Sequence, residues 1–322
     1  GINEVQNFGK FSVKGPNAKA WIGRIMAGRI PKPGRISLTP MLSPKGRLWG
    51  DFTISCLSET EYQLTASYGA QDIHHRWFLM NEAEGVTVEN ISDRRTGFQI
   101  AGPKVREVLQ ACTRADVGAM KFLDVRRMVV GQADCIVQRV SYTGDLGFEI
   151  YCDIMDQRSL WHTLWNAGQP HGMIPFGMRA MMSLRLDRFF GSWLREFSPD
   201  YTAAETGIDR FIDWKRSNFI GHAPAAAERD VPPARQLVTF IVEAEDADVT
   251  AYEPVFINGE VAGFCTSGGY SHHMGQSVAY ALVPRASVAD DLEVEIELLG
   301  KRRKARLALD SGFDPEGVRL RG

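Results

Sequence analysis

Carboxylates that interrupt apolar segments are the side chains of this sequence best suited to chemistry. One is Glu149, which lies between Phe148 and Ile150, shortly after the turn-forming residues that follow Tyr142. Because strand side chains alternate between two faces, Glu149 should point away from Phe148 and Ile150 and lie close to Tyr142 across a hairpin turn. Composition alone favours a solvent-exposed glutamate at this position. The alternative is an acid that binds a ligand.

A second such carboxylate is Asp51, which lies among Trp49, Phe52 and Ile54. We expect it in the second of two apolar strands that are joined by a turn at residues 43–46. Burying a carboxylate costs free energy unless the group is paired or used in function. The pattern alone favours a partly exposed aspartate near the turn, and a catalytic acid is the alternative.

Length and composition limit the classes of protein to which the chain can belong. With 322 residues, 44% of them hydrophobic, it exceeds the usual size of one domain, so we expect two or three lobes. The 37 basic and 39 acidic residues nearly cancel, which argues against a nucleic-acid-binding protein. No apolar run approaches the roughly 20 residues that span a bilayer and no signal peptide opens the sequence, so we expect a soluble protein without membrane contact.

The cysteines and histidines do not form metal-binding patterns. The five cysteines are far apart and include no C-x-x-C pair, which indicates reduced thiols in the cytoplasm or the mitochondrial matrix. The histidine pairs at 74–75 and 272–273 lack the spacing that places two ligands on one helix face. We therefore predict no metal site. Phosphate-binding glycine loops are also absent from the sequence.

Two segments of similar pattern suggest an internal repeat, each consisting of a strand, a Gly-Pro pair at 15–16 or 102–103, and a helix. The longest helix is predicted over Pro175 to Phe190. The Pro- and Ala-rich stretch 222–235 is typical of a linker. After it, short strands separated by Gly and Asn turns predict a small β-barrel over residues 236–322.

The segment from Tyr142 to Glu149, Tyr-Thr-Gly-x-x-Gly-Phe-Glu, resembles the pterin-binding hairpin of the aminomethyltransferase (glycine-cleavage T-protein) family. Segments around Asp51, at 215–221 and at 263–271 extend the resemblance over most of the chain. It implies an α+β, multi-lobed fold with mixed or antiparallel sheets and a C-terminal barrel. The implied domains are a folate-binding domain at 1–221, the linker 222–235 and the barrel 236–322. The first domain would comprise two lobes, roughly 1–45 with 140–221, and 46–139.

The resemblance also implies tetrahydrofolate as cofactor and a role for each matched residue. Asp51 matches an aspartate used beside the reactive pterin nitrogens, and is the implied catalytic residue. The implied cofactor-binding residues are Tyr142, Glu149, Phe8, Ser67 and Tyr68. The family commonly carries Asn where Ser67 aligns. Substrate-binding residues are not identified, with Arg179 and Tyr270 as the weak candidates.

One departure from the transferase pattern indicates a branch of the family. Met181-Met182 replaces an Arg-Asp pair, and the tail Phe-Asp-Pro-Glu-Gly at 313–317 is similar to the C-terminal folate domain of dimethylglycine and sarcosine dehydrogenases. Those enzymes fuse this domain to a flavin domain, so a flavoprotein domain or subunit is an expected partner. Because Gly1 leads almost at once into a strand, we expect a fragment or a processed product.

We therefore expect one-carbon transfer, as an aminomethyl or methylene unit, from an amine-derived donor to N5 of tetrahydrofolate. A first alternative is a tetrahydrofolate-dependent demethylase acting on an O-, S- or N-methyl compound. A second is a non-catalytic folate-binding assembly factor for iron-sulfur proteins, although the segment 215–221 lacks the Cys of that branch. The sequence does not identify the donor or the oligomeric state.

Overall fold

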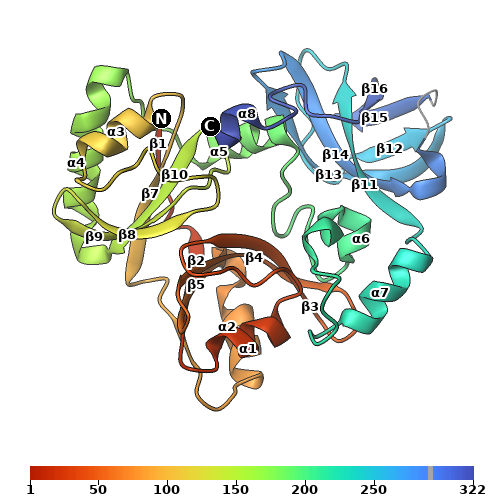
Figure 1. Cartoon of the computed structure of the whole chain (residues 1–322). Coiled ribbons are helices and arrows are strands. Elements are labelled where there is room, and N and C mark those ends of the chain that lie inside the picture. The colour runs from red at the N-terminus through yellow and green to blue at the C-terminus, as the bar shows by residue number, and fades with distance from the viewer. Residues whose placement is uncertain (289–292) are drawn as a thin grey trace.

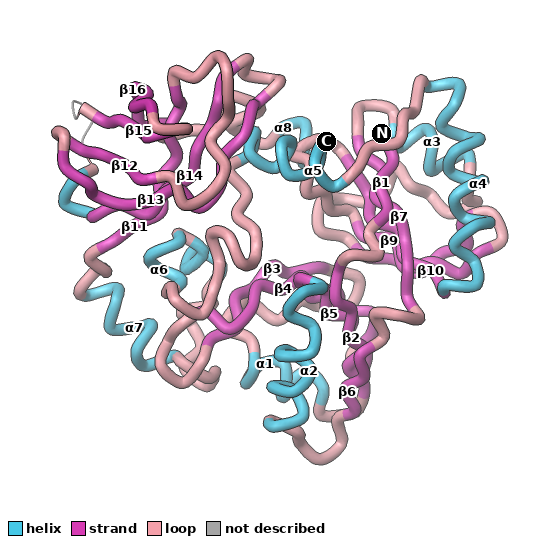
Figure 2. The backbone as a smooth tube through the Cα atoms, turned by 180° about the vertical axis from the view of Figure 1, so that it is seen from behind, coloured by secondary structure: helices cyan, strands magenta, loops and turns pink. Residues whose placement is uncertain are grey.

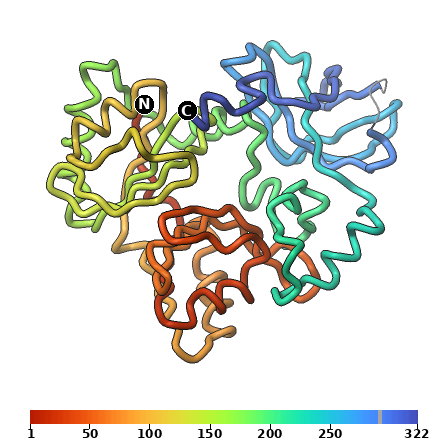
Figure 3. The backbone as a smooth tube through the Cα atoms, in the orientation of Figure 1, coloured from red at the N-terminus to blue at the C-terminus, as the bar shows by residue number. Residues whose placement is uncertain are grey.

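The computed structural model describes residues 1–288 and 293–322. It contains two five-stranded antiparallel sheets and a closed six-stranded barrel, each in its own lobe (Figure 1). The lobes lie at the corners of a triangle, as the path of the chain shows (Figure 3). The predicted α+β fold with a C-terminal barrel is therefore confirmed. Every helix among the described residues is too short or too polar to span a lipid bilayer.

The first sheet carries the strand of Glu149 and has the order β1, β7, β10, β9, β8. These strands span Ile2–Glu4, Arg95–Ala101, Gly147–Asp153, Ala133–Gln138 and Val125–Val130. Helices α3 (Val105–Ala111) and α4 (Gln157–Gly168) pack on one face, where Phe148 and Ile150 are fully buried. Because strand side chains alternate, Glu149 and Tyr151 point to the opposite face.

The second sheet carries the strand of Asp51 and has the order β3, β4, β5, β2, β6. These strands span Ile36–Leu42, Leu48–Ser58, Glu61–Ser67, Phe8–Lys14 and Thr87–Asn90. Helices α1 (Ala18–Ile25) and α2 (Gln71–Met80) cover one face, and the aromatic rings of Phe11, Phe52 and Phe78 pack against each other beneath them. Asp51 alternates with Phe52 and so points to the other face.

The uncovered faces of the two sheets meet and form what we call the inter-sheet layer. A small apolar cluster that includes Ile36 of β3 and Ile136 of β9 joins them, and Arg127 of β8 pairs with Glu61 of β5 at 2.8 Å. Backbone hydrogen bonds from Ile36 N to Leu123 O (2.8 Å) and from Val125 N to Gly34 O (2.9 Å) tie the sheet edges together. Much of the rest of this layer is polar.

The barrel closes in the order β11, β14, β13, β12, β15, β16. Its strands span Arg235–Val242, Gln276–Pro284, Glu260–Ser271, Pro254–Ile257, Val294–Leu298 and Lys301–Ala308. After the barrel, α8 (Val318–Arg321) returns to the first sheet, where Arg139 Nη2 donates to Leu320 O at 2.9 Å. The two ends of the described chain consequently lie near each other, which is also visible from behind (Figure 2).

The structure divides the chain differently from the predicted boundaries. Strands β3 and β4 pair with each other as a hairpin, so the expected boundary at residue 45 falls inside one sheet. The first sheet is built from 2–4 and 95–153, and the second from 8–90. Within the predicted linker at 222–235, α7 spans His222–Asp230. The three consecutive alanines at 225–227 favour helix there.

The predicted helix over 175–190 is wrong, since the structure contains the shorter α5 (Met178–Leu184) and then a 3-10 turn over Arg185–Arg188. The turn ends because Phe189 adopts a left-handed conformation with φ of 56°. A short helix α6 (Ala203–Thr206) follows. After the break at Phe189 the helix does not continue, and residues 190–193 and 197 line the cavity described below.

Gly15 and Gly102 provide a test of the repeated strand–Gly–Pro–helix unit. Both have φ near +130° (131° and 129°), which side chains rarely tolerate. A Cβ on Gly15 would lie 2.0 Å from the carbonyl oxygen of Gly85, whereas the nearest atom to a Cβ on Gly102 is 3.9 Å away. We expect both alanine variants to lose about 1–3 kcal/mol from backbone strain. Gly15→Ala should lose clearly more in urea denaturation. Equal losses would contradict the steric argument.

Candidate functional site

A cavity of about 310 Å³ opens at one end of the inter-sheet layer. It is bounded by β3, β4, β5 and β10, by the connection between β9 and β10, and by the chain at 189–197. The cavity brings together five residues singled out in the sequence, namely Phe8, Asp51, Ser67, Tyr142 and Glu149. Residues up to 141 positions apart in the sequence thus face one space.

Three other candidates lie outside this cavity lining. Tyr68 is 41% exposed in the 3-10 turn Tyr68–Ala70, and Tyr270 is 37% exposed at the end of β13. Arg179 is exposed on α5. The structure therefore does not bring Tyr68, Arg179 or Tyr270 to the acids.

Glu149 is nearly buried, and its carboxylate is held by a neighbour on its own strand. The Tyr151 hydroxyl donates to Glu149 Oε2 at 2.7 Å. Burial raises the pKa of Glu149 to about 7, although the Tyr151 hydrogen bond and the charge of Lys10 oppose the increase. Lys10 is itself buried, and its Nζ donates to Phe8 O at 2.7 Å. Glu149 can therefore gain or lose a proton near neutral pH.

Asp51 occupies the cavity-facing position of β4. Its Oδ1 is buried and has no hydrogen-bond partner among the described residues. Burial raises the pKa of Asp51 to about 6, with partial opposition from a backbone hydrogen bond. At neutral pH Asp51 is mostly ionised, and its free oxygen can accept a proton or a hydrogen bond from a molecule in the cavity.

Tyr142 lies in the connection between β9 and β10, not on a strand arm as the hairpin prediction required. Its hydroxyl donates to Gly191 O at 2.6 Å, and its ring stacks on Phe190 with 6.1 Å between centroids. Burial raises the pKa of Tyr142. The phenol is therefore neutral and its oxygen remains able to accept a further hydrogen bond.

The chain at 189–197 forms a wall of the cavity that the sequence analysis missed. Arg185 and Glu196 form a fully buried ion pair at 2.8 Å. Glu196 also accepts from Ser192 N (2.9 Å) and from the Thr266 hydroxyl of the barrel (2.8 Å), while Arg185 donates to Ser267 Oγ (2.6 Å). The pair thereby fastens the wall to the barrel. No local pattern links Arg185 with Glu196 in the sequence.

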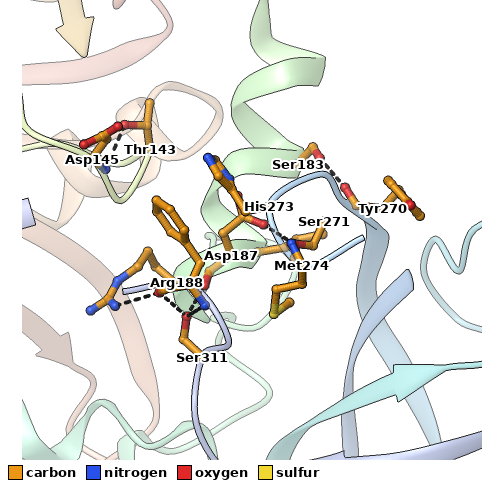
Figure 4. A network of polar contacts seen from close by, with 12 residues as sticks. Thr143, Asp145, Ser183, Asp187, Arg188, Tyr270, Ser271, His273, Met274 and Ser311 are labelled. Carbon is orange, nitrogen blue, oxygen red and sulfur yellow. Dashed lines mark hydrogen bonds and ion pairs between the residues drawn. The ribbon is translucent and has the colours of Figure 1, made fainter. Parts of the chain in front are cut away.

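A second polar network joins the turn after α5 to the barrel (Figure 4). Asp187 accepts hydrogen bonds from the Ser271 hydroxyl and from His273 Nδ1, the latter at 2.5 Å. Nearby, the Ser183 hydroxyl donates to Tyr270 O at 2.6 Å, so the contribution of Tyr270 here is through its backbone. The matched segment at 263–271 therefore positions the cavity wall and does not line the cavity.

The cavity combines two acids with aromatic and apolar walls. Phe8, Phe190 and Trp193 line it together with the methionines Met178, Met181 and Met182. Aromatic walls favour a flat ligand, and carboxylates oriented by buried hydrogen bonds favour N–H donors on its edge. The arrangement suits binding of a planar heterocycle and proton transfer beside it.

Comparison with known proteins matches both parts of the chain. Residues 1–216 match the model of the GCVT N-terminal domain, and residues 235–314 match the glycine cleavage T-protein C-terminal barrel domain. The chain is 34% identical over 310 residues to human dimethylglycine dehydrogenase, covering 94% of this chain but only 36% of that protein. It is 30% identical over 311 residues to the aminomethyltransferase of Moorella thermoacetica, covering 95% and 84% of the two chains.

A solved structure has the same fold. The glycine cleavage system aminomethyltransferase T from Bartonella henselae superposes with a TM-score of 0.87 at 22% identity, covering 96% of this chain and 85% of that one. The two domain models leave 217–234 between them, which includes α7. The chain thus spans most of the aminomethyltransferases but about a third of the dimethylglycine dehydrogenase.

The raised pKa values predict how stability depends on pH. Because Asp51 and Glu149 have pKa values of about 6 and about 7 when folded, against 3.8 and 4.5 for the free groups, the folded protein binds more protons between about pH 4 and 7. Unfolding free energy should therefore fall as pH rises through this window. Glu149→Gln should be more stable than wild type by on the order of 2 kcal/mol at pH 8, and little changed at pH 4.

Urea denaturation at both pH values measures this difference. The matched control is Glu260→Gln at an exposed barrel position, which should change stability little at either pH. An effect of Glu149→Gln that is the same at pH 4 and pH 8 would contradict a buried, titrating carboxylate.

Proposed function

Because this chain belongs to the glycine cleavage T-protein family, we propose that it transfers a one-carbon unit from an amine-derived donor to N5 of tetrahydrofolate. The main support is that Asp51, Tyr142 and Glu149, which stand at motif positions of that family, line the same cavity. Family membership gives the class of transferase, and the side chains around the cavity give the roles proposed below.

The residues around the cavity are compatible with a reduced pterin. Among the described residues, only Oε2 of Glu149 has a hydrogen-bond partner, the Tyr151 hydroxyl, so Oε1 can accept from the N–H edge of the ring. Phe8, Phe190 and Trp193 offer apolar surface to its flat faces. Tetrahydrofolate would supply the nucleophilic nitrogen that receives the carbon unit. Glu149 and Tyr142 would hold the pterin, and Ser67 would line the site beside it.

Asp51 is the proposed acid–base group. A carboxylate with a pKa of about 6 is ionised at neutral pH yet basic enough to take up a proton. Such general-base assistance is worth on the order of a hundredfold in rate. Most of the acceleration would come from holding the donor and the acceptor nitrogen together in a cavity that excludes water.

The donor and the partner protein are proposed from the branch of the family. One relative is a dimethylglycine dehydrogenase of which this chain corresponds to 36%. We propose a dimethylglycine- or sarcosine-derived iminium as donor, delivered by a flavoprotein domain or subunit. Arg179 and Tyr270 receive no support as donor-binding residues because neither lines the cavity. Location in the cytoplasm or the mitochondrial matrix remains a prediction.

We predict that Asp51 and Glu149 affect different steps. Asp51→Asn should lower turnover by about a hundredfold with tetrahydrofolate affinity nearly unchanged, because it removes the base and keeps the shape. Glu149→Gln should weaken tetrahydrofolate binding by about tenfold or more, because it removes a charged acceptor. Isothermal titration and steady-state kinetics measure the two effects. Equal losses of affinity and turnover in Asp51→Asn would make Asp51 structural.

Product analysis separates the proposed transfer from its alternatives. With a donor-generating flavoprotein present, we expect 5,10-methylenetetrahydrofolate as the product. Formation of 5-methyltetrahydrofolate from a methyl compound would identify a demethylase instead. Binding of tetrahydrofolate without turnover of any donor, together with iron-sulfur defects on deletion of the gene, would favour the assembly factor. Absence of tetrahydrofolate binding would reject all three.

A further inference from the structure

The inter-sheet layer contains polar side chains that lack partners. Among the described residues, no hydrogen bond reaches either amide atom of Gln63 or Gln138, nor the hydroxyls of Thr65 and Ser55. These residues are 6% exposed or less. Leaving a buried polar group without a partner is costly, and buried water commonly supplies the missing hydrogen bonds.

The orphaned groups lie next to one another and next to Glu149. Gln138 is the direct cross-strand neighbour of Glu149 between β9 and β10. Gln63 is the direct neighbour of Ser55 between β5 and β4. In an antiparallel pair, side chains opposite each other lie on the same face, which here is the face of the inter-sheet layer. Each sheet therefore contributes polar groups to the same interior region.

Tyr151 lies in the cluster that joins the two sheets. Its hydroxyl donates to Glu149 Oε2 at 2.7 Å. Burial raises the pKa of Tyr151, and the Thr65 hydroxyl of the other sheet is close enough to oppose this, although no hydrogen bond of regular geometry joins them. The polar groups thus continue from Glu149 through Tyr151 to Thr65.

The inter-sheet layer is open at both ends. A second cleft, of about 180 Å³, is lined by Gln63, Arg95 and Arg127, and lies at the opposite ends of the strands from the cavity. Thr65 lines the cavity and Gln63 lines the second cleft. Two residues along a strand span roughly 7 Å, so one or two water molecules can bridge from one space to the other.

We propose that the inter-sheet layer is a water-filled path that carries protons between Glu149 in the cavity and the second cleft. The path runs from Glu149 past Tyr151 and Thr65 to Gln63, with Gln138 and Ser55 holding its water. Each of these side chains can hydrogen-bond water while remaining neutral, apart from Glu149 itself.

The path gives Glu149 a way to lose its proton when a ligand fills the cavity. This role of the path rests on the proposed function. With a pKa of about 7, Glu149 is largely protonated at pH 6.5. A pterin edge that donates hydrogen bonds requires the ionised form of Glu149 as acceptor. The O–H bond of the protonated Glu149 side chain must therefore break, and its electron pair stays on the oxygen. The ligand covers the cavity side, and the proton leaves through water to buffer at the second cleft. Among the described residues, Tyr151 and Lys10 act directly on Glu149, and Asp51 and Tyr142 line the same cavity.

The test follows proton release when tetrahydrofolate binds at pH 6.5. A stopped-flow instrument records tryptophan fluorescence for binding and a pH indicator for the proton. In the wild type, release should keep pace with binding. In Gln63→Leu, which lies outside the cavity lining, binding should proceed while release lags by about tenfold or more, since a hydrogen-bonded link is lost. In Thr65→Val, which lines the cavity, release should lag by a similar factor behind the binding rate measured for that variant. Thr65→Ser restores the hydroxyl and should restore synchronous release.

The matched control is Thr96→Val. Thr96 is also fully buried with an unpartnered hydroxyl, but it is paired with Cys152 and so faces the helix-covered side of the first sheet. The Thr96→Val variant should lose a similar free energy of unfolding, but its proton release should keep pace with tetrahydrofolate binding. Synchronous release in both Thr65→Val and Gln63→Leu would overturn the path, as would an equal lag in Thr96→Val.

A crystal structure of the wild type provides a readout that needs no ligand and no variant. Ordered waters bonded to Thr65, Gln63 and Gln138 would support the path. A dry layer, with these side chains bonded to each other, would overturn it. If tetrahydrofolate gives no binding signal, the proposed function fails, while these waters still decide whether the path exists.

Discussion

The structure depends on keeping two carboxylates away from bulk solvent without neutralising them by direct ion pairs. Glu149 and Asp51 lie where the polar faces of the two sheets meet. Glu149 accepts a hydrogen bond from the Tyr151 hydroxyl, whereas Oδ1 of Asp51 has no hydrogen-bond partner among the described residues. Such burial destabilises the folded protein, and the helix-covered apolar faces of both sheets compensate for it. Groups that titrate near neutral pH are a consequence of this arrangement.

The cavity wall at 189–197 depends in turn on one buried ion pair. Arg185 and Glu196 are both sequestered from solvent, and each also bonds to the barrel. A buried ion pair of this kind adds little net stability. It fixes one geometry of the chain, because removal of either partner would leave an unpaired charge in the interior. The described residues of the barrel contribute no acid to the cavity lining, but the barrel holds the chain at 189–197 that encloses the cavity.

The alternation of the strand around Glu149 predicted which face its side chain occupies, because local periodicity and turn residues determine that face. The β-barrel could be predicted for the same reason. That Phe8, Asp51, Ser67, Tyr142 and Glu149 share one site was implied by the family resemblance. The features that the sequence did not predict depend on tertiary contacts. The lobe boundaries and the wall at 189–197 depend on contacts between distant segments, such as β3 with β4 and Arg185 with Glu196. Tyr68 follows Ser67 directly, yet lies outside the cavity because a 3-10 turn begins there.

The return of α8 to the first sheet has a consequence for biosynthesis. Leu320 lines the same cavity as Asp51 although nearly the whole chain separates them, and its carbonyl is held by Arg139. On the ribosome, both sheets emerge well before this residue. The nascent protein therefore passes through a stage in which both sheets have emerged but the cavity still lacks the side chain of Leu320.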